Sequence, residues 1–268
     1  MILPSFERIL SDEDLAKNTI ETYSYAVRDY LTRYKKPCKA SLSAYKSFLI
    51  STYKPATVNL RILSLNKYMD VLGLDNLKMK TIKMPKESFL DHIISNDDYL
   101  RFKQQLRKEQ DLRWYFVVWF LAATGARISE LVRFKVEDVH AGYVDIYSKG
   151  GRMRRLYFPE KLEKEALKWL ENEGRCSGFL FLNTRGGKLT PRGISLRLKE
   201  FASKYGIDPG QVHPHAFRHL FAKNFLQKNN DIALLADLLG HSSIETTRIY
   251  LQQSSQEQSK MVDEIVDW

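Results

Sequence analysis

The segment from 113 to 125, RWYFVVWFLAATG, constrains the fold more than any other stretch of this chain. It is apolar on nearly every side of a helix, which is typical of a helix buried inside a domain. Gly125 is expected to end that helix. Just before it, SNDDYLRFKQQL, from residue 95, has the polar start of a capped helix. These two segments predict a capped helix followed by a buried one.

The first 77 residues are predicted to be helical. In TIETYSYAVRDYLTRY, residues 19–34, the apolar positions recur with helical spacing. A second helix is expected to begin near Ser41, whose hydroxyl suits a cap. Pro55 introduces a third helix, and Gly73 closes it. The sequence therefore predicts a small N-terminal helical bundle.

A lysine-rich stretch separates this bundle from the rest of the chain. LKMKTIKMPKES, residues 77–88, is interrupted by Pro85 and is interpreted as an interdomain linker, although an ordinary solvated loop has the same composition. The predicted domains are 1–84 and 85–268, the second ending in a tail helix. The net charge of +10 and the pI near 9.4 favour a polyanionic partner, of which nucleic acid is the commonest.

One β signal stands out in the second domain. Val144 and Ile146 alternate with polar residues, SKGGRMR suits a turn, and RLYF returns as the partner strand. FLFLN, residues 179–183, is expected to supply a third strand, and the segments from about 160 to 175 and from 190 onward are predicted to be helical. The predicted fold class is mainly α with a small β-sheet.

Several classes of protein lack support in this sequence. Cys38 and Cys176 give no disulfide framework and no plausible zinc set. MILPSFERIL is too short and too charged for a signal peptide, and no apolar run approaches a transmembrane span. GGKLT, at 186–190, departs from the phosphate-binding P-loop pattern. We therefore expect a soluble cytoplasmic protein with no membrane partner, metal or cofactor.

A dispersed set of polar residues carries the strongest functional signal. His215 and Arg218 lie three residues apart, so they share one face of a helix. In ADLLGH, Gly240 suits the end of a helix and places His241 at the following turn, after which Ser242 or Ser243 can cap the helix that carries Tyr250. Each of these residues has an ordinary structural explanation when it is taken alone.

Two further segments complete the set. TGARISEL contains Arg127, with Glu130 three residues later to hold its guanidinium, and the hairpin carries Lys149. In order and spacing, Arg127, Lys149, His215-x-x-Arg218, His241 and Tyr250 resemble the tyrosine recombinase (phage integrase) family, in particular its Xer-like members. The resemblance covers the last two thirds of the chain. The box HAFRH departs conservatively from the family pattern, in which Leu more often precedes the Arg.

The resemblance implies a fold and a substrate. The fold is an N-terminal, SAM-like helical core-binding bundle followed by a mixed α/β catalytic domain, and the two domains clamp double-stranded DNA from opposite faces. The implied activity is site-specific recombination (DNA integration, excision or dimer resolution) through a 3′-phosphotyrosyl intermediate, without metal or ATP. Alternatives are a type IB topoisomerase-like nicking and closing enzyme, which would act as a monomer, and a DNA-binding regulator of the same fold.

The residue types fit this chemistry. A tyrosine hydroxyl can attack phosphorus and later leave again, because its pKa is about 10, so Tyr250 is the expected nucleophile. Arg127 and Arg218 are expected to neutralise the charge on the phosphate, His241 to donate to it, and His215 to accept a proton or donate to the phosphate. Lys149 is expected to protonate the leaving 5′ oxygen. His213 and His219 are interpreted as structural or DNA-adjacent.

Two surfaces are expected to contact partners. The predicted DNA contacts lie on the polar faces of the bundle, in the linker and in the hairpin: Asn18, Asn59, Arg61, Lys67, Lys78, Lys80, Lys83 and Arg152. The tail after Tyr250 is net acidic and has an apolar stripe, Met261, Val262, Ile265, Val266 and Trp268. It is expected to pack on its own domain or, as the resemblance implies, on a neighbouring subunit, giving a dimer on one site and a tetramer on paired sites.

Overall fold

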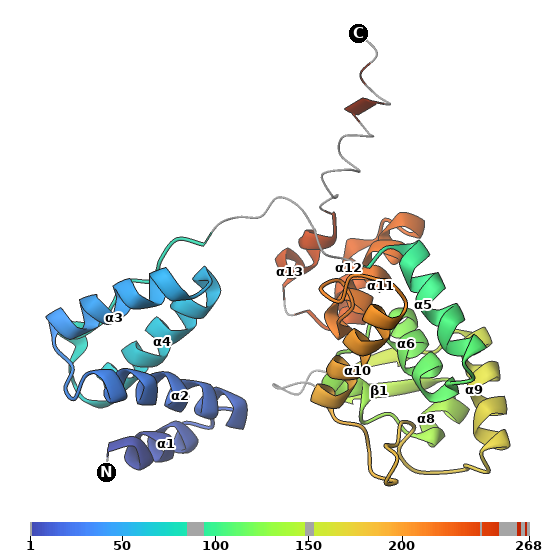
Figure 1. Ribbon diagram of the computed structural model, residues 1–268, viewed down its shortest axis with the longest axis horizontal. Coiled ribbons are helices and arrows are strands. Elements are labelled where there is room, and N and C mark those ends of the chain that lie inside the picture. Colours follow the sequence, from blue (N-terminus) through green and yellow to red (C-terminus); the bar gives the residue numbers. More distant parts are fainter. Residues whose placement is uncertain are drawn as a thin grey trace. The chain divides into compact units, whose positions relative to one another are not determined.

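The computed structural model describes residues 2–84, 94–147, 153–241, 243–251, 262–263 and 266. The chain divides into two compact units, Met1–Glu87 and Ser88–Trp268, and each contains its own hydrophobic core (Figure 1). The fold is mainly helical with one small sheet, as the sequence predicts. In the described part of the chain, none of the helices combines the length and apolar character needed to cross a membrane.

The first unit is a bundle of helices α1 to α4. Their bounds are Ile2–Asp12, Lys17–Arg33, Lys39–Thr52 and Pro55–Val71, and a short 3₁₀ helix, η1, covers Asp75–Leu77. Pro55 occupies the first turn of α4, where a missing N–H costs no hydrogen bond. Gly73 follows α4 with φ +67°, a conformation that glycine adopts without strain.

Helix α3 begins two residues before Ser41, near its expected start. The helix begins at Lys39 and is capped by Cys38, whose sulfur accepts a hydrogen bond from the N–H of Ser41. The Ser41 hydroxyl in turn accepts a hydrogen bond from the N–H of Cys38 at 3.0 Å. Ser41 therefore does cap the helix, but reciprocally and from inside its first turn.

The segment after η1 is held against α4 by two asparagines. Asn66 donates to the carbonyl of Met79 and accepts from its N–H, both at 2.8 Å. Asn59 makes the same pair of bonds with Ile82, at 3.0 and 2.8 Å. Met79 and Ile82 pack against the core of the first unit. The first part of the expected linker therefore belongs to the first unit.

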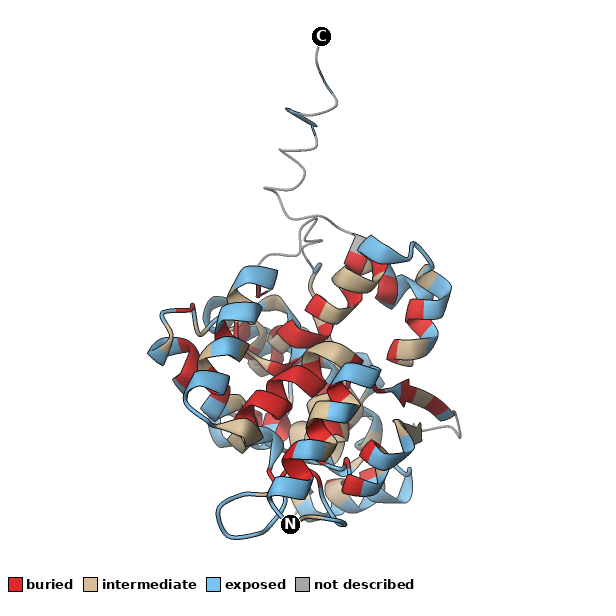
Figure 2. Cartoon of the chain, turned by 90° about the vertical axis from the view of Figure 1, so that its right-hand side faces the viewer, coloured by how far each residue is buried: buried red, intermediate tan, exposed pale blue. Residues whose placement is uncertain are grey.

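The second unit is built around α6, Leu112–Thr124, the helix that the sequence predicts to be buried. Residues 114–121 are all buried, and buried residues are red in Figure 2. Phe116 stacks on Trp169 of α9, Glu160–Asn172, with ring centroids 4.7 Å apart. Trp114 meets Phe201 of α10, Pro191–Lys204, edge to face. Helix α5, Asn96–Lys108, is capped by Ser95 and also packs on α6.

The predicted hairpin is present. Strands β1, Tyr143–Tyr147, and β2, Met153–Tyr157, pair antiparallel, with Val144 opposite Leu156 and Ile146 opposite Arg154. The expected third strand at 179–183 is wrong. This segment makes single bridges to Lys135 and Lys188, and the neighbours that it pairs with are turns and loops. Leu180 and Phe181 are buried there as loop residues of the core.

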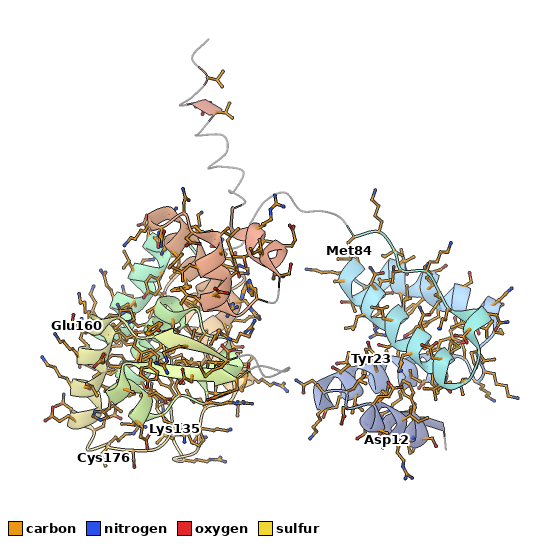
Figure 3. The ribbon with its side chains drawn as sticks, turned by 180° about the vertical axis from the view of Figure 1, so that it is seen from behind. Asp12, Tyr23, Met84, Lys135, Glu160 and Cys176 are labelled. Atoms are coloured by element: carbon orange, nitrogen blue, oxygen red, sulfur yellow. The ribbon has the colours of Figure 1, made fainter. Side chains whose placement is uncertain are left out.

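The remaining elements surround the site described below. They are α7 (Ile128–Leu131), α8 (Val136–Ala141), α11 (Pro214–Lys228), α12 (Ile232–Leu239), α13 (Ile244–Arg248) and the 3₁₀ helix η2 (Ile249–Leu251). Gly125 ends α6 and Gly240 ends α12, both in the left-handed conformation, as predicted. The two cysteines are free and exposed, and Figure 3 labels Cys176.

Candidate active site

Arg127 lies at the start of α7, immediately after the turn that ends α6. Its backbone N–H donates to Glu130 Oε2 at 2.7 Å and its Nη1 donates to Glu130 Oε1 at 3.1 Å. Glu130 therefore fixes both the backbone and the guanidinium, as the spacing predicts. The Arg127 side chain keeps about a third of its surface exposed, at 35%. It is both held and accessible, which a phosphate ligand requires.

Arg218 is the most buried cation of the site. It projects from α11 and is only 4% exposed. Nη1 donates to the carbonyl of Gly125 at 2.8 Å, and Nη2 donates to the carbonyl of Leu239 at 2.7 Å. Burial, together with the charge of Arg127, lowers the pKa of Arg218 to about 10, so the guanidinium stays protonated at neutral pH.

Three arginines donate hydrogen bonds to main-chain carbonyls at the end of α12. Arg154 Nε donates to the carbonyl of Leu238 at 3.0 Å, Arg218 to that of Leu239, and Arg127 Nη2 to that of Gly240 at 3.4 Å. Three successive carbonyls thus receive three guanidiniums from three different elements. The last carbonyls of a helix lack intrahelical partners and carry its negative dipole end, so they stabilise clustered cations.

Arg154 belongs to this cluster of arginines, although it lies in none of the motifs of the sequence. It faces inward from β2, and its side chain is only 7% exposed. Nη2 donates to Glu130 Oε2 at 2.8 Å. The alternation of the strand is the signal that could have found it, because Arg154 and Leu156 are two residues apart and must share the buried face.

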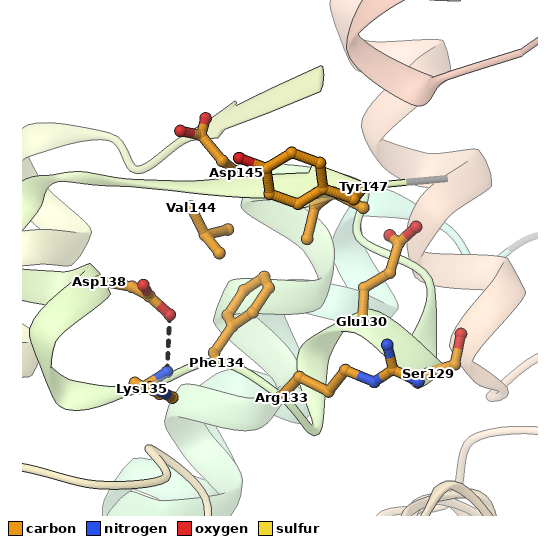
Figure 4. Close-up of a pocket in the computed structure, with 10 residues that line it drawn as sticks. Ser129, Glu130, Arg133, Phe134, Lys135, Asp138, Val144, Asp145 and Tyr147 are labelled. Carbon is orange, nitrogen blue, oxygen red and sulfur yellow. Dashed lines mark hydrogen bonds between the residues drawn. The ribbon is translucent and has the colours of Figure 1, made fainter. Parts of the chain in front are cut away.

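Glu130 also borders a recess next to the site. Ser129 and Arg133 line it beside Glu130, and Val144 and Tyr147 of β1 line it from the hairpin (Figure 4). Burial works against the charged form of Glu130, but hydrogen bonds and the charge of Arg154, with bonds from Arg127, outweigh it and lower its pKa. The carboxylate is therefore ionised between two arginines.

The hydrogen bonds of His241 fix its tautomer. Nε2 lies 3.0 Å from Arg218 Nη2, and a guanidinium can only donate, so Nε2 accepts. Nδ1 must then carry the proton and donate to the Thr247 hydroxyl at 2.8 Å. Burial and the charges of Arg218 and Arg127 lower the pKa of His241 to about 4. His241 is neutral in the free protein, and its accepting nitrogen faces Arg218.

Tyr250 lies in η2, where its ring is enclosed by two histidines. It is 7% exposed, and its ring is stacked on His241 at 6.1 Å and tilted against His219 at 5.2 Å. Burial raises the pKa of the phenol, while the charge of Arg218, a hydrogen bond with Arg218 and the charge of Arg127 partly oppose that shift. The phenol is therefore protonated at neutral pH and lies beside the arginines.

The other histidines of α11 differ in their surroundings. His213 caps the helix, and its Nδ1 accepts from the N–H of Ala216 at 3.2 Å. His215 is exposed, and partial desolvation of its ring, with the charges of Arg218 and Arg127, lowers its pKa. Burial lowers the pKa of His219 to about 4, and its Nδ1 has no hydrogen-bond partner within the described residues.

The structure thus brings Arg127, Arg218, His241 and Tyr250 together, with His215 on the same helix as Arg218. Lys149 and Arg152 lie outside the described residues, and their roles stay predictions. Thr247 is a second residue that sequence reasoning missed. It is fully buried and polar, and it lies three positions before Tyr250. The sequence shows only a threonine one helical turn before the expected nucleophile, and its burial is known from the structure alone.

The predicted DNA contacts of the first unit have varied surroundings. Asn18 is exposed near the start of α2, whereas Asn59 holds Ile82 and Lys67 donates to Glu13 at 2.7 Å. Lys78 forms ion pairs with Asp70 and Asp75, and Lys80 and Lys83 are exposed.

Arg61 has the most enclosed position of that group. It is 7% exposed, and its Nη1 donates to Asp29 Oδ2 at 2.6 Å and to the Tyr45 hydroxyl at 3.2 Å. Burial works against ionisation of Asp29, but the Tyr45 hydrogen bond and the charge of Arg61 lower its pKa overall. A DNA contact by Arg61 stays a prediction.

Comparisons with known proteins show the family and the fold of this chain. The model of the phage integrase family matches residues 92–257. The tyrosine recombinase XerA of Pyrococcus furiosus is 29% identical over 271 residues, which are 98% of this chain and 93% of that protein. The tyrosine recombinase XerD of Yersinia pestis is 30% identical over 267 residues, 89% of this chain and 88% of that protein. A Tn1549 transposon integrase solved with a circular intermediate DNA has the same fold, with a TM-score of 0.74, 15% identity and 99% coverage of both chains.

Proposed function

The chain belongs to the phage integrase family and is a DNA strand-exchanging tyrosine recombinase, and we propose that the site around Tyr250 carries out its reaction. One observation carries the assignment. Nη2 of Arg218 contacts both the Leu239 carbonyl and His241, and the ring of Tyr250 is stacked on that same histidine. A nucleophile and a phosphate-binding cation are therefore neighbours in a buried, preorganised setting.

In the proposed reaction, Tyr250 Oη attacks the phosphorus of a DNA backbone phosphate. A bond forms between Oη and phosphorus, and the bond from phosphorus to the 5′ oxygen breaks, which leaves a 3′-phosphotyrosyl link and a free 5′-hydroxyl. Attack by the 5′-hydroxyl of another strand reverses these bonds and releases Tyr250. The phosphoester energy is kept in the covalent link, so rejoining needs no nucleotide cofactor.

Arg127 and Arg218 are proposed to neutralise the non-bridging oxygens as phosphorus becomes five-coordinate. Both guanidiniums are fixed by carbonyls and Glu130 before DNA arrives, so little reorganisation is needed at the moment of reaction. Each such preorganised donor is worth about 3 kcal/mol of transition-state stabilisation. The Arg127 side chain is partly exposed, whereas Arg218 is buried. Arg127 is therefore the one that is open to an incoming phosphate.

Proton transfer is proposed to involve His215 and Lys149. Because burial raises the pKa of Tyr250, the phenol must lose its proton as it attacks. His215 has a lowered pKa and is neutral at pH 7, so it can accept that proton. Lys149 is proposed to supply the proton that the departing 5′ oxygen needs. His241 is proposed to donate to the phosphate from Nε2, which must first take up a proton once DNA has separated it from Arg218.

The proposed partner is double-stranded DNA, and the net charge of +10 supports it. We further propose that the protein acts in the cytoplasm as a dimer on one site and a tetramer on paired sites, joined by the C-terminal tail. This proposal is supported by two apolar tail residues that are exposed within the described part of the chain, Val262 and Val266. Met261, Ile265 and Trp268 lie outside it.

The test is covalent trapping on DNA that the protein itself selects. Genomic fragments that the protein binds are incubated with it in EDTA, quenched with SDS and analysed for DNA attached to protein. We expect an adduct from the wild type and from Tyr147→Phe, a matched loss of an exposed hydroxyl, and none from Tyr250→Phe. An adduct that persists in Tyr250→Phe, or its absence from every protein despite binding, would contradict the proposal.

A further inference from the structure

We propose that Arg154 is a positioning residue for strand cleavage, which holds Arg127 in its phosphate-binding position through Glu130 and through the end of α12. The inference rests on the proposed function. It assigns to Arg154 no contact with DNA and no proton transfer. It predicts that loss of Arg154 slows cleavage by misplacing a neighbouring cation.

The first support is the way Glu130 is shared. Its carboxylate accepts three hydrogen bonds, from the N–H of Arg127, from Arg127 Nη1 and from Arg154 Nη2, at 2.7, 3.1 and 2.8 Å. Arg154 is the fully enclosed member of this group, with its side chain 7% exposed against 35% for Arg127. Arg154 therefore acts as the fixed side of a clamp whose other side is Arg127.

The charge of Glu130 depends on the same contact. Burial alone disfavours the carboxylate, and the hydrogen bond and charge of Arg154 are the leading influences that lower its pKa again. Without Arg154, Glu130 would face its burial penalty with only one cation beside it. The ion pair between Glu130 and the Arg127 guanidinium would then be weaker, and its geometry less well fixed.

The second support is the contact with α12. Arg154 Nε bonds to the Leu238 carbonyl, two residues before Gly240, whose own carbonyl receives Arg127. A Cβ atom added at Gly240 would lie 2.7 Å from Arg154 Cδ and 2.8 Å from its Nη1, so Arg154 packs directly against this glycine. Arg154 thereby connects both groups that hold Arg127, the Glu130 carboxylate and the Gly240 carbonyl.

A buried cation in this place also carries an electrostatic cost. The charge of Arg154 is among the influences that lower the pKa values of Arg218 and His241, and its Nη1 has no hydrogen-bond partner among the described residues. A purely structural residue could avoid both costs, since an apolar side chain would fill the same space. The contacts to Glu130 and Leu238 are what an apolar replacement could not reproduce.

The test begins with adjacent arginines on one strand. Arg155 is also paired with a carboxylate, Asp145, at 2.8 Å, but it lies on the more exposed side of β2. In single-turnover cleavage of a bound DNA site with saturating protein, we expect Arg154→Met to be about 100-fold slower than wild type. We expect Arg155→Met to remain within about threefold, and both variants to bind DNA as wild type does.

Modified phosphates then identify the step that Arg154 serves. A methylphosphonate at the scissile position removes a non-bridging charge, so we expect it to shrink the Arg154→Met defect to about tenfold or less. A bridging 5′-phosphorothiolate supplies a leaving group that needs no proton, and with it the 100-fold defect should remain. A simple loss of packing would slow all three substrates equally.

The outcomes separate the inference from the proposed function. If the wild type forms no Tyr250-dependent adduct, the proposed function fails. If it does, equal rates for Arg154→Met and Arg155→Met, or relief by the phosphorothiolate alone, would overturn the role of Arg154. Should Arg154→Met fail to fold, Arg154→Lys replaces it, because it keeps the charge but cannot span Glu130 and Leu238. We then expect about a tenfold defect with the same substrate pattern.

Discussion

The direction of single hydrogen bonds decides what the residues of this site can do. Nε2 of His241 accepts a hydrogen bond from Arg218, because a guanidinium has no lone pair to offer. The ring proton must therefore lie on Nδ1, which donates a hydrogen bond to the Thr247 hydroxyl. Thr247 is fully buried, so water cannot replace it. The tautomer of His241 therefore depends on the hydroxyl of Thr247.

This dependence predicts the effect of Thr247→Val. The substitution keeps the shape of the side chain but leaves the Nδ1–H of His241 without a partner, so we expect cleavage about fivefold slower, in keeping with a loss near 1 kcal/mol. Nitrogen NMR of the imidazole should show a mixture of tautomers in place of one. Thr246→Val, at an exposed neighbour, is the control. If it slowed cleavage equally, the tautomer argument would be wrong.

At this scale the sequence predicted residues whose chemical type was distinctive. Arg127, Arg218, His241 and Tyr250 were found because their order and spacing matched a known pattern, and the structure brings them together. Arg154 and Thr247 were missed because their importance comes from burial and from what they touch. Burial and contacts cannot be read from the type of a residue. For Arg154, however, the alternation of the strand could have indicated a buried side chain.

Among the elements, the end of α12 has the most consequences for the site. Gly240 adopts φ +63° and packs against Arg154, so its replacement would combine backbone strain with a steric clash. Arg154 cannot move aside without losing the hydrogen bonds of its guanidinium to Glu130 and to the Leu238 carbonyl. The position of this glycine should therefore matter for stability and for cleavage together.

We expect Gly240→Ala to lower the free energy of unfolding of the second unit by about 2 to 3 kcal/mol. Gly174→Ala is a matched control, because Gly174 has φ +64° with nothing within 4 Å of an added Cβ, and strain alone should cost about 1 kcal/mol. Urea unfolding gives both values. Equal losses in the two variants would show that the contact with Arg154 carries no energy.

Elements were predictable where local signals were strong. The α6 helix followed from its all-round apolar character, and Gly125 and Gly240 ended helices as expected. Two expectations about elements differ from the structure, one for a non-local and one for a local reason. The 179–183 segment has a strand-like composition, but its neighbours in space are loops. The start of α3 moved because the Cys38 sulfur, an unusual cap, serves in place of a hydroxyl.

For the whole molecule, the question is which cations are available to DNA. Lys80 and Lys83 are exposed on the segment that Asn59 and Asn66 hold against α4, whereas Lys67 lies 2.6 Å from Glu13. A lysine already paired with a carboxylate brings little net charge to a phosphate. Exposure and pairing therefore rank the predicted DNA contacts in a way that sequence alone could not.

The ranking predicts the salt dependence of DNA binding. Each of Lys80→Ala and Lys83→Ala should reduce the slope of log K against log salt concentration by about 1, because one phosphate contact is lost. Lys67→Ala should change the slope by less than half as much. Affinities measured on one duplex at several salt concentrations give the slopes. A larger effect for Lys67 than for either of the others would contradict the ranking.

The arginines of the site are anchored on the carbonyls of Leu238, Leu239 and Gly240, which are main-chain atoms. No substitution at 238 or 239 can delete such an acceptor, so side chains there are free to change as far as packing allows. A change of length is different. Inserting or deleting one residue within α12 would turn its end by about 100° and shift it by about 1.5 Å, and all three guanidiniums would lose their acceptors together. The site is therefore built to tolerate replacements in this helix and to reject insertions and deletions.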